Sequence, residues 1–169
     1  MGVPNLGASN AGGVVWTDVG GLISLIPISD APSAQLGISV ALSGDGTLAL
    51  LGRVGEVLPY RFSGGVWTAE STPLLAETST EAPAVVLDAA GDDALLATVG
   101  LGVVGAVRWY HRTGTTWTLV ETFRGTTVSE KFGASVAISR DGRRALVGAP
   151  GDSTMGSNTG AVHVYALAP

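Results

Sequence analysis

The chain has 169 residues, of which 46% are hydrophobic and 14% charged, so it can bury a core and is not disordered. The net charge is −5 and the basic residues form no run, which argues against nucleic acid or an anionic membrane as a partner. There is no cysteine, which excludes disulfides and thiolate chemistry. No stretch is apolar enough for a signal peptide or a membrane span, and we expect neither in this chain.

In chain order, the first elements expected are two strands, GVVWTDV and LISLIPI. The rest of the chain repeats itself with a period near 48 residues. The segment GISVALSGDGTLALLG at 37–52 matches GASVAISRDGRRALVG at 133–148, an offset of 96 residues without a gap. A degenerate copy, AVVLDAAGDDALLA, lies between them at 84–97. A second half begins at residues 55, 105 and 160 and brings Tyr60, Tyr110 and Tyr165 into register.

Each repeat predicts four short strands, because alternating apolar segments are separated by turn residues. The turn Asp141-Gly142 is typical of a tight hairpin, since Asp-Gly readily adopts the positive φ angles it needs. In the first two units a Ser/Thr-Gly turn leads into a fourth strand headed by Trp67 or Trp117. No segment has the apolar spacing of an amphipathic helix. We expect thirteen strands, with the last unit ending after its third.

The third unit carries a characteristic succession of residues: Phe132, Gly133, Asp141, Gly142, Gly148, Ala149 and Pro150. This succession resembles the FG-GAP repeat of integrin α-subunit-like β-propellers, and the Trp-headed turns resemble the bacterial form of that repeat. The resemblance implies an all-β fold of β-propeller blades, each of four antiparallel strands. It also implies that Phe132 fills the space between blades and that Gly133 and Gly148 allow close backbone approach.

About three blades are expected, because the starting segment 3–12 is similar to 149–160. We expect a partial blade at 1–28, blades at 29–75 and 76–124, and an incomplete blade at 125–169. A closed propeller needs about four to eight blades, so the chain is expected to form an open arc or part of a larger propeller. Further blades of a longer chain, or a second copy of this one, are therefore candidate partners.

Metal binding is not expected. Integrin-like blades often hold calcium in the loop between the first two strands, and calcium prefers six or more oxygen ligands. The corresponding loops here read SGDGT, AAGDDA and SRDGR, with few carboxylates, and Arg140, Arg143 and Arg144 crowd the last. We interpret all three as plain hairpin turns and expect no cofactor.

The sequence shows no enzyme signature. His111 and His163 lie at non-equivalent positions, and no carboxylate is apparent beside either. There is no Gly-x-Ser-x-Gly elbow, and GLGVVG at 100–105 lacks the following helix that a phosphate site needs. We expect a protein that is not an enzyme.

Two features could bind a ligand. Propellers usually bind through loops at one rim, which favours the polar loop containing Asp152, Ser153 and Asn158. Trp67 and Trp117 could stack on sugar rings, although packing would also explain their repetition. The resemblance implies an extracellular or cell-surface binding and adhesion module for a protein or glycan ligand. A carbohydrate-binding, lectin-like oligomeric propeller is the alternative.

Overall fold

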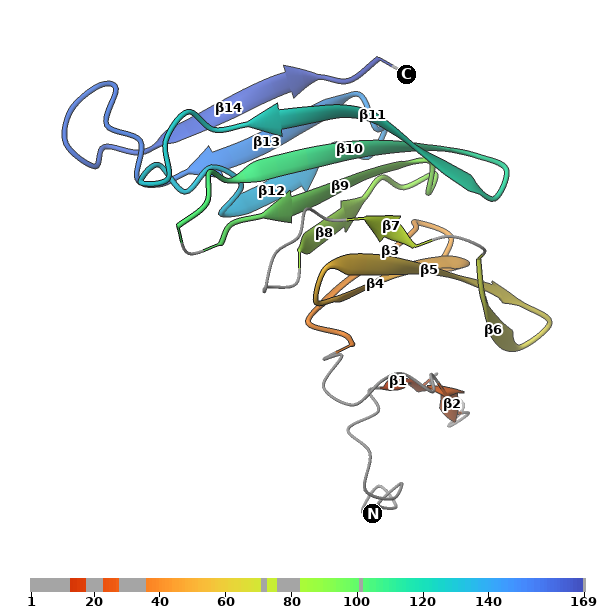
Figure 1. Cartoon of the computed structure of the whole chain (residues 1–169). Coiled ribbons are helices and arrows are strands. Elements are labelled where there is room, and N and C mark those ends of the chain that lie inside the picture. The colour runs from red at the N-terminus through yellow and green to blue at the C-terminus, as the bar shows by residue number, and fades with distance from the viewer. Residues whose placement is uncertain are drawn as a thin grey trace, which may run out of the picture.

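The computed structural model of the chain is all β over the residues it describes (Figure 1). These are residues 13–17, 23–27, 36–70, 73–75, 83–100 and 102–168. Among them the structure contains no helix that is long and apolar enough to cross a membrane. The N-terminal strands β1 (Gly13–Thr17) and β2 (Ile23–Pro27) pair as an antiparallel hairpin, as the sequence predicts. The greater part of the predicted partial blade at 1–28 lies outside the described residues.

The remaining strands form three antiparallel sheets, which we call blades 1, 2 and 3. Blade 1 contains β3 (Ser39–Leu42), β4 (Leu48–Arg53), β5 (Glu56–Ser63) and β6 (Val66–Ala69). Blade 2 contains β8 (Ala84–Leu87), β9 (Asp93–Thr98), β10 (Ala106–Thr113) and β11 (Thr116–Arg124). Blade 3 contains β12 (Ser135–Ile138), β13 (Arg144–Ala149) and β14 (Ala161–Ala166). This arrangement confirms the predicted fold class.

One short strand was not predicted. Strand β7 (Leu74–Leu75) pairs with the start of β5, so the described residues contain fourteen strands rather than thirteen. Leu74 is fully buried in the cluster between blades 1 and 2. A strand of two residues is too short for any alternation to reveal, which is why the sequence pattern misses it.

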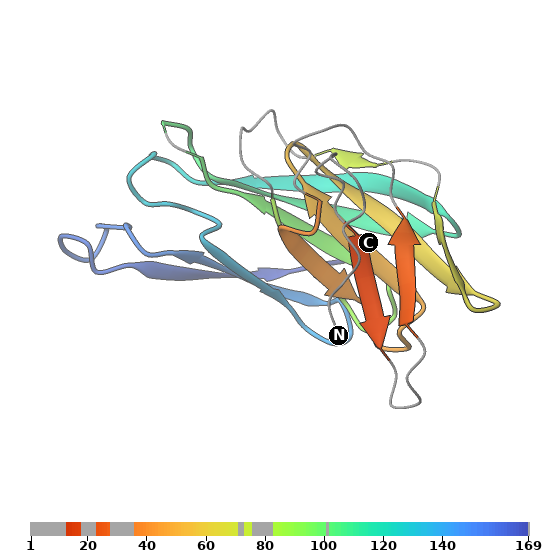
Figure 2. The same cartoon turned by 90° about the horizontal axis from the view of Figure 1, so that it is seen from below.

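Blade 2 lies between blades 1 and 3 (Figures 1 and 2). Alternate residues of β9 point to opposite faces of the sheet: Leu96 packs toward blade 1 and Leu95 toward blade 3. Every residue of β9 is therefore buried. Burying both faces of a sheet requires a neighbour on each side, which explains why the same apolar positions recur in successive units.

Phe132 lies in the apolar cluster between blades 2 and 3 and is fully buried. Its ring packs edge-on against His163, with the ring centroids 5.2 Å apart. The next residue, Gly133, has a φ of +87°, a conformation that favours glycine. A Cβ at this position would lie 3.3 Å from the side chain of Val107 in blade 2.

The other repeat residues build the core hairpin of blade 3. Asp141 and Gly142 form the turn between β12 and β13, where Gly142 has a φ of +70°. Gly148 lies so close to Ser135 that a Cβ would collide with the Ser135 hydroxyl. Ala149 is fully buried and ends β13, whereas the following Pro150 is exposed and begins a loop.

The first hairpins of the three blades are joined by backbone hydrogen bonds along one rim. The N–H of Gly44 donates to the carbonyl of Ala89 at 2.9 Å. In turn, the N–H of Ala89 donates to the carbonyl of Arg140 at 3.2 Å. These residues occupy corresponding positions of the three units, so this rim is a continuous edge, which we call the hairpin rim.

Candidate functional site

The polar loop of residues 150–160 connects β13 to β14 and projects beyond blade 3 (Figure 1). Asp152, predicted as a contact residue, is instead buried and organises the loop. Its Oδ1 atom accepts the N–H of Thr154 at 2.8 Å, and its carbonyl accepts the N–H of Gly160 at 2.9 Å. The hydrogen bonds from Thr154 hold the pKa of Asp152 below its ordinary value, so its carboxylate is ionised at neutral pH.

Ser153 and Asn158 are exposed, as expected of contact residues. They also hold each other, because the N–H of Asn158 donates to the Ser153 Oγ at 3.0 Å. Between them lies Met155, which is 88% exposed and which the sequence analysis did not single out. A lone methionine in a Gly/Ser/Thr loop is a signal that could have been noticed, because methionine is a frequent contact residue at binding surfaces.

At the opposite end of the blades, Trp67 and Trp117 lie beside the hairpin rim. Trp67 is half-buried, and its ring lies 5.2 Å from that of Phe62. A cavity of about 300 Å³ opens beside these two rings. The side chain of Trp117 packs against the cluster between blades 1 and 2, and the guanidinium carbon of Arg112 lies 5.8 Å from its ring centroid. Arg112 thus lies over the ring of Trp117, and the role of either tryptophan as a sugar platform stays a prediction.

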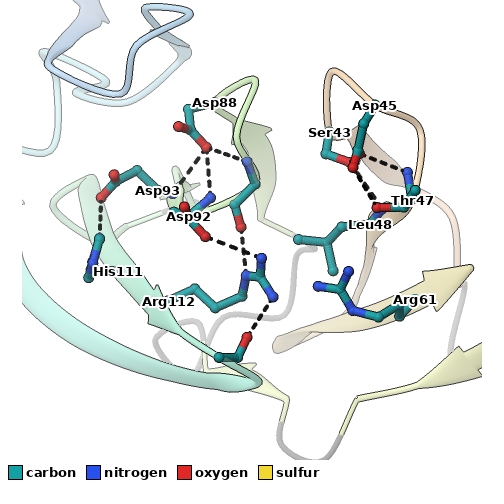
Figure 3. Close-up of polar contacts among 12 residues, drawn as sticks. Ser43, Asp45, Thr47, Leu48, Arg61, Asp88, Asp92, Asp93, His111 and Arg112 are labelled. Atoms are coloured by element: carbon teal, nitrogen blue, oxygen red, sulfur yellow. Dashed lines mark hydrogen bonds and ion pairs between the residues drawn. The ribbon is translucent and has the colours of Figure 1, made fainter.

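The guanidinium group of Arg112 has four further contacts, of which Figure 3 draws those with the β8–β9 and β10–β11 turns, and the fourth is an ion pair with Glu70 at 3.9 Å. Its Nε and Nη1 donate to the carbonyls of Gly91 and Gly114, at 2.7 and 2.6 Å. Its Nη2 lies 3.2 Å from Asp92 Oδ1. An arginine held on this many sides stays over the ring, so the rim of blade 2 is closed by the chain itself.

A carboxylate–imidazole pair lies next to Arg112, on strands β9 and β10 of blade 2. Asp93 and His111 are cross-strand partners on β9 and β10, and the His111 Nδ1 lies 3.1 Å from Asp93 Oδ1. The same oxygen accepts the Trp109 indole N–H at 2.7 Å. The sequence analysis saw no carboxylate beside His111, because the pairing depends on strand register. A carboxylate oxygen shared by two ring N–H groups serves mainly to hold those rings in place.

The aspartates of the hairpin rim are occupied by hydrogen bonds from their own turns (Figure 3). The Oδ1 of Asp88 accepts three backbone N–H groups, those of Gly91, Asp92 and Asp93, at 2.8 to 3.1 Å. Within the described ranges, no three His, Asp or Glu side chains gather as a metal site would require. The expectation of no calcium in these turns stays a prediction.

Comparison with known proteins bears on the third unit most directly. Residues 125–165 match the family model of the FG-GAP repeat, which confirms the repeat identified from the sequence. No curated protein matches the chain. The chain is therefore a β-propeller-like module that contains an FG-GAP repeat.

Among solved structures, the chain is similar to a protein of Bacteroides uniformis assigned as a 6-phosphogluconolactonase. The two are 17% identical with a TM-score of 0.62, and the match covers 93% of this chain. The chain spans only 47% of that protein. A likeness at this level of identity shows a shared fold alone and says nothing about activity.

Proposed function

We propose that this protein is a non-catalytic binding module of the adhesion type, acting outside the cell or at its surface on a protein ligand. The observation that carries the proposal is the loop of residues 150–160. Its backbone is held by Asp152, while Ser153, Met155 and Asn158 face solvent. A loop ordered before binding loses little conformational freedom when it meets a partner. The extracellular location rests on the likeness of the repeat to integrin-type propellers.

A panel of purified secreted proteins tests this function. We expect a protein of the panel to bind, and Met155→Asp to weaken that binding about tenfold, since loss of one buried contact is worth on the order of 1.4 kcal/mol. Thr115→Asp, in the exposed β10–β11 turn at the other rim, is the matched control and should leave binding unchanged. A panel without any binder, or binding insensitive to Met155→Asp, would contradict the proposal.

The alternative of catalysis has one specific source, the solved structure assigned as a 6-phosphogluconolactonase. A general base could be sought in the Asp93–His111 pair, which brings an imidazole and a carboxylate within 3.1 Å of each other. We expect no hydrolysis of 6-phosphoglucono-δ-lactone above the rate in buffer. Hydrolysis that His111→Ala abolishes would show that the protein is an enzyme.

The lectin-like alternative requires repeated aromatic platforms. Of the two predicted platforms, Trp67 borders a cavity, whereas Arg112 lies over the ring of Trp117. A glycan array on the wild type and on Trp67→Ala separates the two functions. Glycan binding lost in Trp67→Ala, together with no binding on the protein panel, would favour the lectin.

A further inference from the structure

The cavity on the rim of blade 1 has walls of two kinds. It is lined by Asp45, Gly46, Thr47, Phe62 and Trp67 and has a volume of about 300 Å³. The two rings come from β5 and β6, where Phe62 and Trp67 are directly opposite each other. The polar wall comes from the β3–β4 turn. Asp45 therefore lines the same space as an indole and a phenyl ring.

Blade 2 has the same local backbone with a different side chain in it. Arg112 and Trp117 are opposite each other on β10 and β11, in the positions that Phe62 and Trp67 hold in blade 1. The N–H of Phe62 donates to the carbonyl of Thr47 at 2.8 Å, and the N–H of Arg112 donates to the carbonyl of Asp92 at 2.7 Å. The two sites differ in the side chain opposite the tryptophan, which is Phe62 in blade 1 and Arg112 in blade 2, and in the position of the turn carboxylate.

The contacts of Arg112 show which chemistry this site accepts. In blade 2 the guanidinium meets an indole face, the carbonyl of Gly91 and the carboxylate of Asp92. It also donates to the carbonyl of Gly114 and lies 3.9 Å from the carboxylate of Glu70. Blade 1 offers counterparts to the indole, to the Gly91 carbonyl and to one carboxylate. Trp67 and Gly46 stand at the corresponding positions, and the carboxylate is supplied from two residues earlier in the turn, by Asp45. An indole face, a backbone carbonyl and a carboxylate each attract a planar cation such as guanidinium.

The carboxylate of Asp45 is ionised and held in place (Figure 3). Its Oδ1 accepts the Ser43 hydroxyl at 2.6 Å and its Oδ2 accepts the Thr47 hydroxyl at 2.8 Å. These hydrogen bonds, that from Ser43 first, lower the pKa of Asp45 to about 2. Asp45 is exposed, so its remaining lone pairs are open to a ligand.

We propose that the cavity on the rim of blade 1 binds the guanidinium group of an arginine on a partner protein, as Arg112 fills the same place in blade 2. This inference rests on the proposed protein-binding function and names the chemistry of one contact. The net charge of −5 also favours a basic partner surface. A sugar ring could stack on Trp67 as well, but a sugar has no counterpart in blade 2.

An NMR titration of the ¹⁵N-labelled protein tests the inference. The probe is N-acetyl-arginine methylamide, and the matched control is N-acetyl-citrulline methylamide, which has a similar shape without the charge. We expect saturable shifts of the Trp67 indole signal and of the Gly46 and Thr47 amides with the arginine probe only. Weak, millimolar binding is expected of a single side chain.

Two variants locate the binding site. Asp45→Asn should reduce affinity on the order of tenfold, because a hydrogen bond to a charged group is lost. Asp141→Asn is the matched control in blade 3, where Asp141 accepts the Ser139 hydroxyl at the same 2.6 Å in the equivalent turn. Phe62→Arg should abolish binding of the probe, because the new side chain would fill the cavity from within.

Equal shifts with the citrulline probe, or unchanged affinity in Asp45→Asn, would overturn the inference. Shifts of Trp67 with methyl glycosides and not with the arginine probe would replace it with a sugar site. The titration is independent of the loop of residues 150–160. A failed titration beside Met155-dependent protein binding therefore refutes the arginine site alone, whereas the protein panel decides the proposed function.

Discussion

Leu95 and Leu146 occupy the same position in blades 2 and 3, yet Leu95 is fully buried and Leu146 is 45% exposed. The same contrast holds one strand further along. Val107 is fully buried in β10, whereas its counterpart in β14, Val162, is 67% exposed. The face of blade 3 that points away from blade 2 thus carries the apolar pattern that blade 2 buries against its neighbour.

We therefore predict that the chain associates with itself or with further blades through this face. Light scattering should show an apparent mass that rises with concentration, and Leu146→Glu with Val162→Glu should suppress the rise. The double variant should change stability little, because both side chains are exposed. Leu95→Glu is the contrasting control and should unfold the protein, since it buries a charge. A wild type that stays monomeric at every concentration would contradict this prediction.

Phe132→Ala should lower the free energy of unfolding by about 3–5 kcal/mol, as expected when a fully buried aromatic residue is truncated. The substitution would remove packing contacts from the cluster between blades 2 and 3, including the contact of Phe132 with the His163 ring. Urea denaturation followed by tryptophan fluorescence measures the change. Met155→Ala, which removes an exposed side chain, should cost less than about 0.5 kcal/mol. Similar losses in the two variants would show that Phe132 is not a packing residue.

Arg112→Ala should destabilise the protein by about 1–3 kcal/mol, because hydrogen bonds from a charged group to two carbonyls are lost. The ion pair with Asp92, whose side chain is 48% exposed, adds little, whereas the pair with Glu70, whose side chain is 5% exposed, adds more. Arg112→Lys should recover only part of this loss, since an ammonium cannot reproduce the planar fork of contacts. Arg143→Ala, which truncates an exposed arginine, is the control and should change stability by less than about 0.5 kcal/mol. If Arg112→Lys were as stable as the wild type, the charge of Arg112 alone would account for its contribution to stability.

The pKa of Asp45, lowered from 3.8 to about 2, has a consequence for stability at acid pH. A carboxyl whose pKa is lower in the folded state stabilises that state above its ordinary pKa. The contribution is therefore present above pH 4 and is lost as the pH falls toward 2. Ser43→Ala should raise the pKa of Asp45, because the Ser43 hydroxyl is the largest cause of the shift. A carboxyl ¹³C titration by NMR measures it, and an unchanged pKa would contradict this assignment.

Calcium should leave the melting temperature unchanged, because a ligand stabilises only a protein that binds it. The turn aspartates are engaged by their own loops, as Asp88 is by three N–H groups and Asp141 by Ser139. Melting curves in calcium and in chelator provide the comparison. A rise of several degrees in calcium would place an ion in one of these turns.

The fold could be predicted from sequence because its signals are local. Alternation of apolar residues identifies strands, Asp141-Gly142 identifies a hairpin, and recurrence of the same positions shows that blades stack. The exposed residues Ser153 and Asn158 could also be found, because polar loop composition is visible without a structure. Strand β7 was not predicted, because two residues that pair with β5 are too few to show an alternation of apolar and polar side chains.

What depends on tertiary structure is which side chains meet. Trp67 and Trp117 occupy corresponding positions of two repeats, so the sequence gives no reason to distinguish them. Only the folded chain shows that Arg112 covers one ring and that a cavity remains beside the other. Likewise, Asp93 and His111 are eighteen residues apart and meet only through the register of β9 and β10. Periodicity determines which face a residue lies on, whereas contacts across strands and turns depend on register and on the shape of each neighbouring side chain.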